Sequence, residues 1–520
     1  MHRAVKRVVI VGGGSAGWLT AGVLASRFNT QAKNGLKVIL VESPDVATIG
    51  VGEGTWPSMR TTLQKMGISE TDFMRECDVS LKQGSRFDNW VTGETDHYYH
   101  PFSLPQGFGE VNLANYWQKV RDKISFADAV CQQSQICDRG LAAKSISTPE
   151  YAFNANYGYH LDAGKFAGFL QRHCVEKLGV EHVLDHVIKV NSRPNGDIES
   201  LTTKDSGAIH GDLFIDCTGF ASILIGQHYG VPFKSVSDVL FNDSALAVHV
   251  PYKDENDPIA SHTLSTAQSA GWIWNIGLPS RRGVGHVYSS KYISDENAER
   301  ELRNYIEPIV GRRQAEELSV RKIAIDPGYR SQFWHRNCVA VGLSAGFVEP
   351  LEASALVMVE FAAKMIAEQL PANRELMAIS AKRFNQKFSY RWEKIIDFLK
   401  LHYVLNRRDD NGYWAASRMI DSVPESLQES LRLWQHQAPW LEDAPNFDEL
   451  FPSASFQFVL YGMGFSTQQN SLPLRDEDAS LAMANKLFSD NARKTAQMVS
   501  SLPSNRQLIN KVMEFGFQKL

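Results

Sequence analysis

Apolar and helix-forming positions alternate along the N-terminal part of the chain. Residues 6–11 (KRVVIV) end in a continuous β-branched run bounded by glycine, which is typical of a buried parallel strand. Residues 18–27 carry helix-forming side chains, and residues 37–41 (KVILV) are typical of a second strand, which ends at Glu42. The pattern predicts a strand, a helix and a second parallel strand, which together open an α/β sheet.

Two later apolar runs fit the same sheet. Residues 211–216 are typical of a buried strand that ends in the small-residue turn 217–219. Residues 338–342 predict another strand, and helix-forming residues resume from Glu352. We expect these strands to lie beside the opening unit, within one large body that spans residues 1–370.

The remaining residues, 371–520, follow a mainly helical pattern. Amphipathic stretches run near 374–405, 424–437 and 484–517. Proline breaks occur at Pro424, Pro439, Pro445 and Pro503. The sequence therefore predicts an α/β body followed by a mainly helical C-terminal region.

Composition and charge narrow the class of protein. Of the 520 residues, 43% are hydrophobic and 22% are charged, which is ordinary for a folded protein and excludes global disorder or a membrane bundle. The net charge is −4, so no basic excess points to nucleic acid or to an anionic membrane as a partner. The six cysteines include no CxxC pair, which favours a reducing, cytoplasmic location.

The apolar stretch of residues 8–25 follows three basic residues and loosely resembles a secretion signal. The glycines inside it favour another interpretation, because residues 12–17 read Gly-Gly-Gly-Ser-Ala-Gly and place a G-x-G-x-x-G fingerprint at the predicted strand-to-helix turn. Gly12 permits the tight turn, Gly14 lets the backbone approach a pyrophosphate, and Gly17 lets helix and strand pack closely. Glu42 is placed to accept hydrogen bonds from ribose hydroxyls.

The fingerprint alone does not separate NAD from FAD. The predicted strands at 211–216 and 338–342 favour FAD, because flavoprotein monooxygenase-like folds return such strands beside the first unit. The sequence contains no second G-x-G-x-x-G, so we expect no domain for a nicotinamide cofactor. Reduced flavin is then expected from a separate flavin reductase.

Five motifs carry a resemblance to a known family. They are residues 12–18 (GGGSAGW), 48–55 (TIGVGEGT), 80–84 with 87–90 (SLKQG and FDNW), 271–276 (GWIWNI) and 346–352 (GFVEPLE). From Val8 to about Trp414 the sequence resembles the flavin-dependent halogenases of the tryptophan halogenase type. The resemblance implies an FAD-binding Rossmann-like body, interleaved with substrate-binding segments at about 60–150 and 231–320, and a C-terminal region that caps the substrate.

The resemblance also implies a reaction. Reduced FAD and oxygen convert chloride or bromide into hypohalous acid, which moves to a separate aromatic substrate. Lys82 is implied as the catalytic lysine, since an amine on a flexible stem can hydrogen-bond hypohalous acid or carry the halogen as a haloamine. Glu352 is implied as the carboxylate that stabilises the cationic intermediate and removes its proton. We expect both side chains to face one cavity.

Further binding residues follow from the same resemblance. The halide is expected on the backbone N–H groups of Ser354 and Ala355, and the arene beside His100 and Phe102. Flavin contacts are expected from Gly12, Gly13, Gly14, Ala16, Gly17, Glu42, Ser43, Val46, Ile49, Val51, Gly54, Val187, Leu343 and Leu356.

The chain departs from the family pattern at two places. Gly277 stands where the W-x-W-x-I-P signature has proline, and residues 353–355 read Ala-Ser-Ala where the family has Ser-Thr-Gly. Alanine adopts a positive φ less readily than glycine, which places the halide geometry in question.

Other side chains give weaker signals. Trp272 and Trp274 alternate with Ile273, so on a strand both rings project to one face, and we assign them no catalytic role. His182 and His186 have i,i+4 spacing, but no third ligand is suggested, so we expect no metal site. C-terminal rings are available to wall the substrate site: Trp414, Trp434, Trp440, Phe456, Phe458 and Tyr461.

The sequence thus predicts an FAD-dependent halogenase of tryptophan, indole or another electron-rich arene. A flavoprotein monooxygenase of the same fold and a non-catalytic flavin-binding protein are the alternatives. The expected partners are a flavin reductase and a small aromatic substrate, with no nucleic acid and no membrane, and self-association as a homodimer is a further hypothesis.

Overall fold

The computed structural model describes residues 4–45, 52–409, 412–446, 448–468 and 475–519. The chain divides into two compact units, each built from three separate stretches. The first unit contains Met1–Val79, Leu161–Val236 and Asp326–Trp392. The second contains Ser80–His160, Ser237–Ile325 and Glu393–Leu520.

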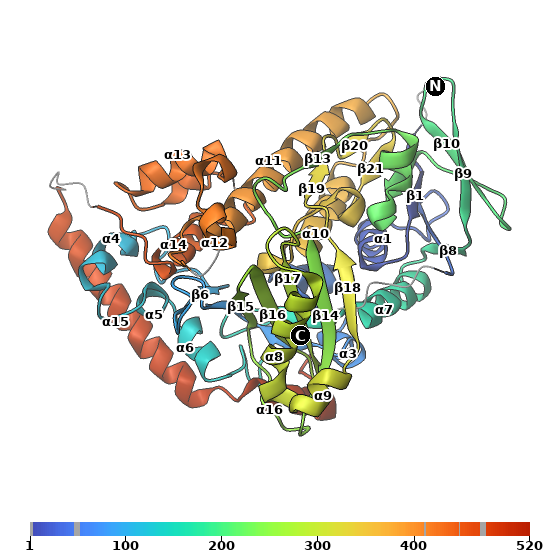
Figure 1. Ribbon diagram of the computed structural model, residues 1–520. Helices are drawn as coiled ribbons and strands as arrows, with labels where there is room; N and C mark the ends of the chain where they lie inside the picture. The colour runs from blue at the N-terminus through green and yellow to red at the C-terminus, as the bar shows by residue number, and fades with distance from the viewer. Residues whose placement is uncertain (1–3, 46–51, 410–411, 447, 469–474, 520) are drawn as a thin grey trace. The chain divides into compact units, whose positions relative to one another are not determined.

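The first unit is built on a six-stranded sheet (Figure 1). Its strand order is β20 (Trp334–His335), β21 (Cys338–Ala340), β12 (Leu213–Asp216), β1 (Arg7–Val11), β2 (Lys37–Glu42) and β8 (Glu181–Leu184). All neighbours are parallel except β20 and β21. The predicted first two strands are confirmed, and the strands predicted near 211–216 and 338–342 join the same sheet beside β1.

Three helices pack together in the first unit. Helix α1 (Ser15–Arg27) contacts both α10 (Ser354–Glu368) and α7 (Ala163–Glu176). The side chain of Asp162 caps α7 by accepting from the backbone N–H of Lys165 at 3.0 Å. Two shorter helices, α2 (Ser58–Lys65) and α3 (Glu70–Glu76), complete the described helices near this group.

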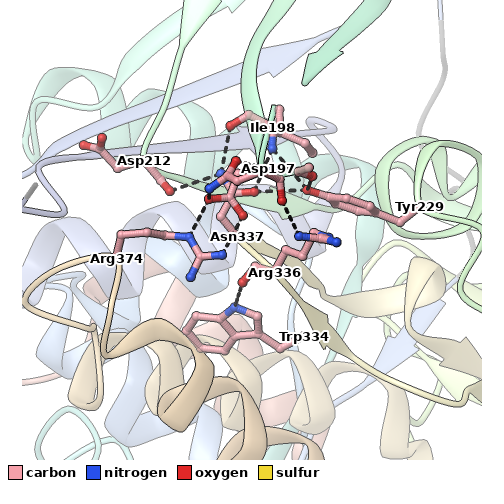
Figure 2. Close-up of polar contacts among 10 residues, drawn as sticks. Asp197, Ile198, Asp212, Tyr229, Trp334, Arg336, Asn337 and Arg374 are labelled. Carbon is pink, nitrogen blue, oxygen red and sulfur yellow. Dashed lines mark hydrogen bonds and ion pairs between the residues drawn. The ribbon is translucent and has the colours of Figure 1, made fainter. Parts of the chain in front are cut away.

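A small antiparallel sheet is linked to the rest of the unit by a network of hydrogen bonds (Figure 2). It consists of β9 (Val187–Ser192), β10 (Ile198–Thr203) and β11 (Ala208–His210). The Asn337 amide pairs with the backbone of Ile198 in both directions, at 2.8 and 2.9 Å. Arg374 holds Asp197 through two hydrogen bonds of 2.6 Å (Figure 2). Because each polar group finds a partner, the sheet is fixed to the loop that precedes β21.

The second unit is built on a seven-stranded sheet. Its order is β18 (Val320–Ala324), β14 (Ser244–Pro251), β17 (Arg281–Tyr288), β16 (Gly271–Gly277), β15 (Thr263–Gln268), β5 (Gly84–Asp88) and β6 (His97–Pro101). Only β15 and β5 pair in parallel. A separate short strand, β4 (Ser80–Lys82), pairs antiparallel with β7 (Gly158–Asp162).

The two faces of the seven-stranded sheet carry different side chains. On one face, Ile273 and Val284 pack against Leu302 and Ile306 of helix α8 (Asp295–Val310). Trp272 and Trp274 flank Ile273 on β16, so they project from the opposite face, as the alternation predicts.

The C-terminal region of the second unit is helical, as predicted. Its helices are the end of α11 (Met377–Val404), α12 (Gly412–Ser417), α13 (Glu425–Trp434), α14 (Ser453–Gly462), α15 (Glu477–Ser501) and α16 (Asn505–Phe515). The stretch predicted at 484–517 is two helices, because Pro503 interrupts it and Ser504 caps α16. Within the described parts of the chain, no helix has the length and apolar character to cross a membrane.

Candidate active site

The glycine turn between β1 and α1 has the shape of a phosphate-binding turn. Gly12 has a φ of 111°, and a side chain on Gly17 would place its Cβ 1.9 Å from the carbonyl oxygen of Gly12. A Cβ on Gly14 would meet no atom within 4 Å. Helix α1 begins without a side-chain cap or an acidic residue in its first turn. Its N–H groups and positive dipole end therefore suit a diphosphate such as that of FAD.

Glu42 is held beside this turn. Its carboxylate accepts from Trp18 Nε1 at 3.3 Å and lies 3.0 Å from His182 Nε2. A Cβ on Gly13 would lie 1.2 Å from Glu42 Oε2, so only glycine leaves the carboxylate where it is. A carboxylate can accept about four hydrogen bonds, which leaves capacity for ribose hydroxyls.

The two histidines noted in the sequence are carboxylate partners. His182 pairs with Glu42, and His186 lies 3.0 Å from Asp45 and 3.2 Å from Ser43 Oγ. Among the described residues, no group of three or more His, Cys, Asp or Glu side chains could hold a metal ion.

The other predicted flavin contacts that the structure describes also lie in the first unit. Gly54 is buried in β3 (Gly52–Gly54), and Val187 begins β9. Leu343 is half-buried in the turn after β21, beside Gly342, whose added Cβ would lie 2.8 Å from the Cβ of Ala16. Leu356 is buried in the first turn of α10. Val46, Ile49 and Val51 lie outside the described residues.

A strained turn leads into α10. Glu352 and Ala353 are consecutive left-handed residues, with φ of 64° and 55°. Ser354 has a φ of −75°, and Ala355 lies in regular helix without a positive φ. The replacement of glycine by Ala355 therefore imposes no strain, because the left-handed residues come earlier in the turn. The N–H groups of residues 354 and 355 stand at a helix N-terminus, which suits an anion.

Glu352 itself is buried, with 4% of its surface exposed. Its backbone carbonyl accepts from Trp56 Nε1 at 2.8 Å. Trp56 precedes α2, so this bond links the turn to a segment almost 300 residues earlier in the chain. The sequence did not single out Trp56, although it directly follows the motif of residues 48–55.

Lys82 is among the largest fully buried side chains of the protein, with 1% exposed. It lies on β4 opposite Gly158, which contributes no side chain at that position. Its Nζ lies 5.2 Å from the centroid of the Phe102 ring. Lysine side chains are almost never fully buried in proteins, so Lys82 is not an ordinary solvated surface charge.

His160 is a neighbour of Lys82 that sequence reasoning missed. It pairs with Ser80 across the two strands, diagonally from Lys82, and its Nε2 lies 2.8 Å from Thr263 Oγ1. Burial, together with the positive charge of Lys82, holds the pKa of His160 well below its ordinary value. His160 is therefore a neutral hydrogen-bonding group at neutral pH.

His100 and Phe102 lie in different surroundings. Phe102 faces Lys82, whereas His100 Nε2 bonds Ser455 Oγ at 2.9 Å. The His100 ring also packs against Phe398, Phe451 and Phe458, with centroids 5.4 to 6.4 Å away. The structure thus brings Phe102 to Lys82 and His100 to the C-terminal helices of the same unit.

The W-x-W motif lies within an aromatic layer of the second unit. Trp274 covers Gly285, whose added Cβ would lie 2.1 Å from the Trp274 ring, and Trp272 contacts Trp90 at 6.2 Å between centroids. Gly277 ends the same strand. A side chain there would place its Cβ 3.0 Å from Ile259 Cγ2 and 3.2 Å from Tyr252 Oη, so a larger residue at position 277 would be crowded by those two side chains.

The C-terminal rings pack mainly among themselves and against neighbouring segments. Trp414 meets Trp90, Phe458 meets Phe126, and Tyr461 meets Trp117, at 5.1 to 5.6 Å between centroids. Trp434 lies 5.3 Å from Phe456, and Trp440 lies 5.1 Å from Phe108. Their role as walls of a substrate site stays a prediction.

The sheet, the glycine turn and the held carboxylate define an α/β protein of the dinucleotide-binding class, with features that fit FAD. The family profile described as tryptophan halogenase matches residues 7–478 of this chain. The 7-chloro-L-tryptophan 6-halogenase KtzR of Kutzneria sp. (strain 744) is 34% identical over 528 residues, covering 97% of this chain and 99% of KtzR. The tryptophan 6-halogenase SttH of Streptomyces toxytricini is 34% identical over 523 residues, covering 96% and 97%.

A solved structure gives the same result. The crystal structure of a tryptophan halogenase from Shewanella frigidimarina NCIMB 400 is 51% identical and covers 99% of each chain, with a TM-score of 0.96. The chain belongs to the tryptophan halogenase family and is a flavin-dependent enzyme of that family. The predicted fold class, an α/β body with a helical C-terminal region, is confirmed.

Proposed function

We propose that this protein uses reduced FAD, oxygen and chloride or bromide to halogenate an electron-rich arene, with tryptophan as the first candidate and indole as the second. The names of KtzR and SttH specify tryptophan substrates. The observation that carries the proposal is the buried amine of Lys82, set over the ring of Phe102. Such an amine has no structural need to be buried, so its place argues for chemistry.

Bound reduced FAD, with oxygen, would supply the oxidising power that turns halide into hypohalous acid. The glycine turn and the N-terminus of α1 would hold its diphosphate, and Glu42 would accept from its ribose. Halide would lie on the N–H groups of Ser354 and Ala355. Because the sequence has a single G-x-G-x-x-G fingerprint, we infer that a separate reductase provides the reduced flavin.

Lys82 would deliver the halogen in one of two ways. Its nitrogen can donate a hydrogen bond to the oxygen of hypohalous acid and so make the halogen more electrophilic. Alternatively, the neutral amine attacks the halogen to form a haloamine, and the released hydroxide takes the amine proton to leave as water. Both routes need Lys82 shielded from bulk water, which its burial provides.

Glu352 would act on the arene. Addition of the electrophilic halogen leaves a cationic ring, which a nearby carboxylate stabilises before it removes the ring proton. Glu352 is buried, and its backbone is fixed by the bond from Trp56. Glu352 belongs to the first unit and Lys82 to the second. The joint prediction that both side chains face one cavity remains part of this proposal.

The deciding experiment supplies the purified protein with FAD, a flavin reductase, NADH, oxygen and bromide. Tryptophan, indole and a panel of other arenes are offered in turn, and mass spectrometry searches for the bromine isotope doublet. A brominated tryptophan supports the proposal in full. A hydroxylated product without any halogenated one, with either bromide or chloride, would establish a monooxygenase in its place. No turnover of any arene, with flavin bound, would instead favour the non-catalytic flavin-binding protein.

A further inference from the structure

Glu360 is a buried carboxyl group for which the proposed mechanism has no use. It lies on α10, six residues beyond Ser354, with 4% of its surface exposed. Each of its oxygens is taken by one hydroxyl of helix α2. Ser58 Oγ donates to Oε1 at 3.0 Å, and Thr62 Oγ1 donates to Oε2. Ser58 and Thr62 are four residues apart, so both point from one face of α2.

A second contact joins the same two segments. Trp56, two residues before α2, donates its indole N–H to the carbonyl of Glu352 at 2.8 Å. Residues 56–62 are therefore hydrogen-bonded to residues 352–360 at two places. Trp56 bonds the turn at Glu352, and Ser58 and Thr62 bond Glu360 on the helix. We call this set of contacts the α2–α10 clamp.

The turn inside the clamp needs such support. Glu352 and Ala353 both have positive φ, at 64° and 55°, and neither is glycine. Non-glycine residues persist in the left-handed region only when their surroundings hold them there. The turn carries the proposed general base and leads directly to the N–H groups proposed for halide, whose positions tolerate little error.

A carboxyl group suits this task better than an apolar side chain would. An apolar residue of the same size could slide along α2 at little cost, and it would pack without losing hydration. The two oxygens of Glu360 instead require both hydroxyls at once, which only one register of α2 on α10 provides. The two hydrogen bonds of Glu360 thus fix the position of α2 on α10, and α2 in turn fixes the position of Trp56.

We propose that Glu360 is a positioning residue for this turn: by fixing α2 on α10 it holds Trp56 on the Glu352 carbonyl and keeps Glu352, Ser354 and Ala355 in their working geometry. The assignment of the general base and the halide site rests on the proposed function. The clamp itself does not, because it consists of contacts within the first unit. Glu360 acts through the turn and touches no reactant.

Four variants separate the proposal from a general loss of stability. Glu360→Leu keeps the size and removes the acceptor, whereas Glu360→Gln keeps a group that can accept one hydroxyl and donate to the other. Ser58→Ala with Thr62→Val removes the donors and leaves Glu360 in place. Glu368→Leu changes an exposed acid on the same helix and serves as the matched control.

The first measurement is hydrogen exchange of the flavin-free protein, read by mass spectrometry over residues 350–358. The backbone N–H of Ala353 bonds the carbonyl of Pro350 at 3.0 Å, so it reports on the turn. Glu360→Leu and the Ser58/Thr62 double variant should each raise its exchange rate about two- to tenfold. Combining all three changes should add little, since they remove one interaction. If Glu360→Leu and the double variant are both folded and the Ala353 N–H exchanges at the wild-type rate in each, the proposal is wrong.

The second measurement is steady-state bromination across bromide concentrations. Loss of the clamp should raise the KM for bromide about two- to tenfold, with kcat changed much less, and Glu360→Gln should restore most of the loss. A fall in kcat alone, in proportion to unfolded protein, shows a merely structural role and refutes the proposal. If the wild type brominates nothing, the proposed function fails, while the exchange experiment still decides whether Glu360 holds the turn.

Discussion

Lys82 and Phe102 meet as an amine over an aromatic ring, with Nζ 5.2 Å from the ring centroid and both side chains buried. A cation over a desolvated ring gains about 2 kcal/mol, which is enough to fix where the end of a flexible side chain lies. Gly158 stands opposite Lys82 and leaves room for this arrangement. Two residues singled out for different roles therefore lie in direct contact, with the amine fixed over the ring.

Replacing Lys82 with methionine should abolish halogenation and spare the flavin. Methionine fills a similar volume, so the buried strand should tolerate it, but it can neither donate a hydrogen bond nor carry a halogen. We expect the rate of bromination to fall at least about 100-fold, while peroxide release by reduced flavin is unchanged. Lys253→Met, at an exposed lysine of the same unit, is the control. Bromination at near the wild-type rate would remove Lys82 from the mechanism.

Alanine at Gly14 should separate flavin binding from stability. Its Cβ would meet no protein atom within 4 Å, and the backbone angles of φ −74° and ψ −177° suit any residue, so the flavin-free protein should be as stable as the wild type. The Cβ would instead occupy the approach to the pyrophosphate, and the Kd for FAD should rise at least about tenfold.

Gly13→Ala is the matched comparison for Gly14→Ala. Its Cβ would fall 1.2 Å from Glu42 Oε2 and displace the carboxylate from Trp18 and His182, so this variant should lose both affinity and about 1 kcal/mol of stability. Flavin fluorescence and thermal melting measure the two quantities. Equal FAD affinity of Gly14→Ala and wild type would show that the diphosphate binds elsewhere.

The stability of Glu360→Gln relative to wild type should depend on pH. Burial raises the pKa of Glu360 from 4.5 to about 7, although its two hydroxyl partners lower it. Between pH 4.5 and about pH 7 the folded protein holds a proton that the unfolded chain has released. The stability of the wild type therefore falls as pH rises and levels off above about pH 7. Glutamine has no such proton. The free energy of unfolding of Glu360→Gln, relative to that of the wild type, should therefore rise between pH 5 and pH 8, by no more than about 3 kcal/mol.

Urea denaturation at four pH values from 5 to 8 measures this difference. Burial also raises the pKa of Glu53 to about 7, but Glu53 titrates in both proteins and cancels from the comparison. If the difference in free energy of unfolding between variant and wild type is constant from pH 5 to pH 8, Glu360 is ionised throughout that range.

The elements that the sequence predicts well are those with a strong local signal. The β-branched runs, the glycine turn and the proline break at Pro503 each specify local structure through sterics. The motif around Lys82 located the lysine, but only the fold shows that it is buried over Phe102.

The supporting residues could not be found in the same way. Glu360 and Thr62 are 298 positions apart, and each reads locally as an ordinary polar residue in a helix. His182 is 140 residues from Glu42, and neither its own surroundings in the sequence nor its spacing from His186 points to that carboxylate. Partners of this kind are set by how the sheet and helices pack, which no short stretch of sequence encodes.

The turn before α10 gives a final prediction, in which glycine at two neighbouring positions has opposite effects. Ala353 has a φ of 55° and a ψ of 43°, a left-handed conformation that costs alanine about 1 kcal/mol more than glycine. Ala353→Gly should therefore raise the melting temperature. Ala355 is helical, so Ala355→Gly, which restores the family residue, should cost up to about 1 kcal/mol and leave the KM for bromide within about twofold of wild type. A large fall in that KM would show that halide binding needs a left-handed residue at position 355, and that the turn rearranges when halide enters.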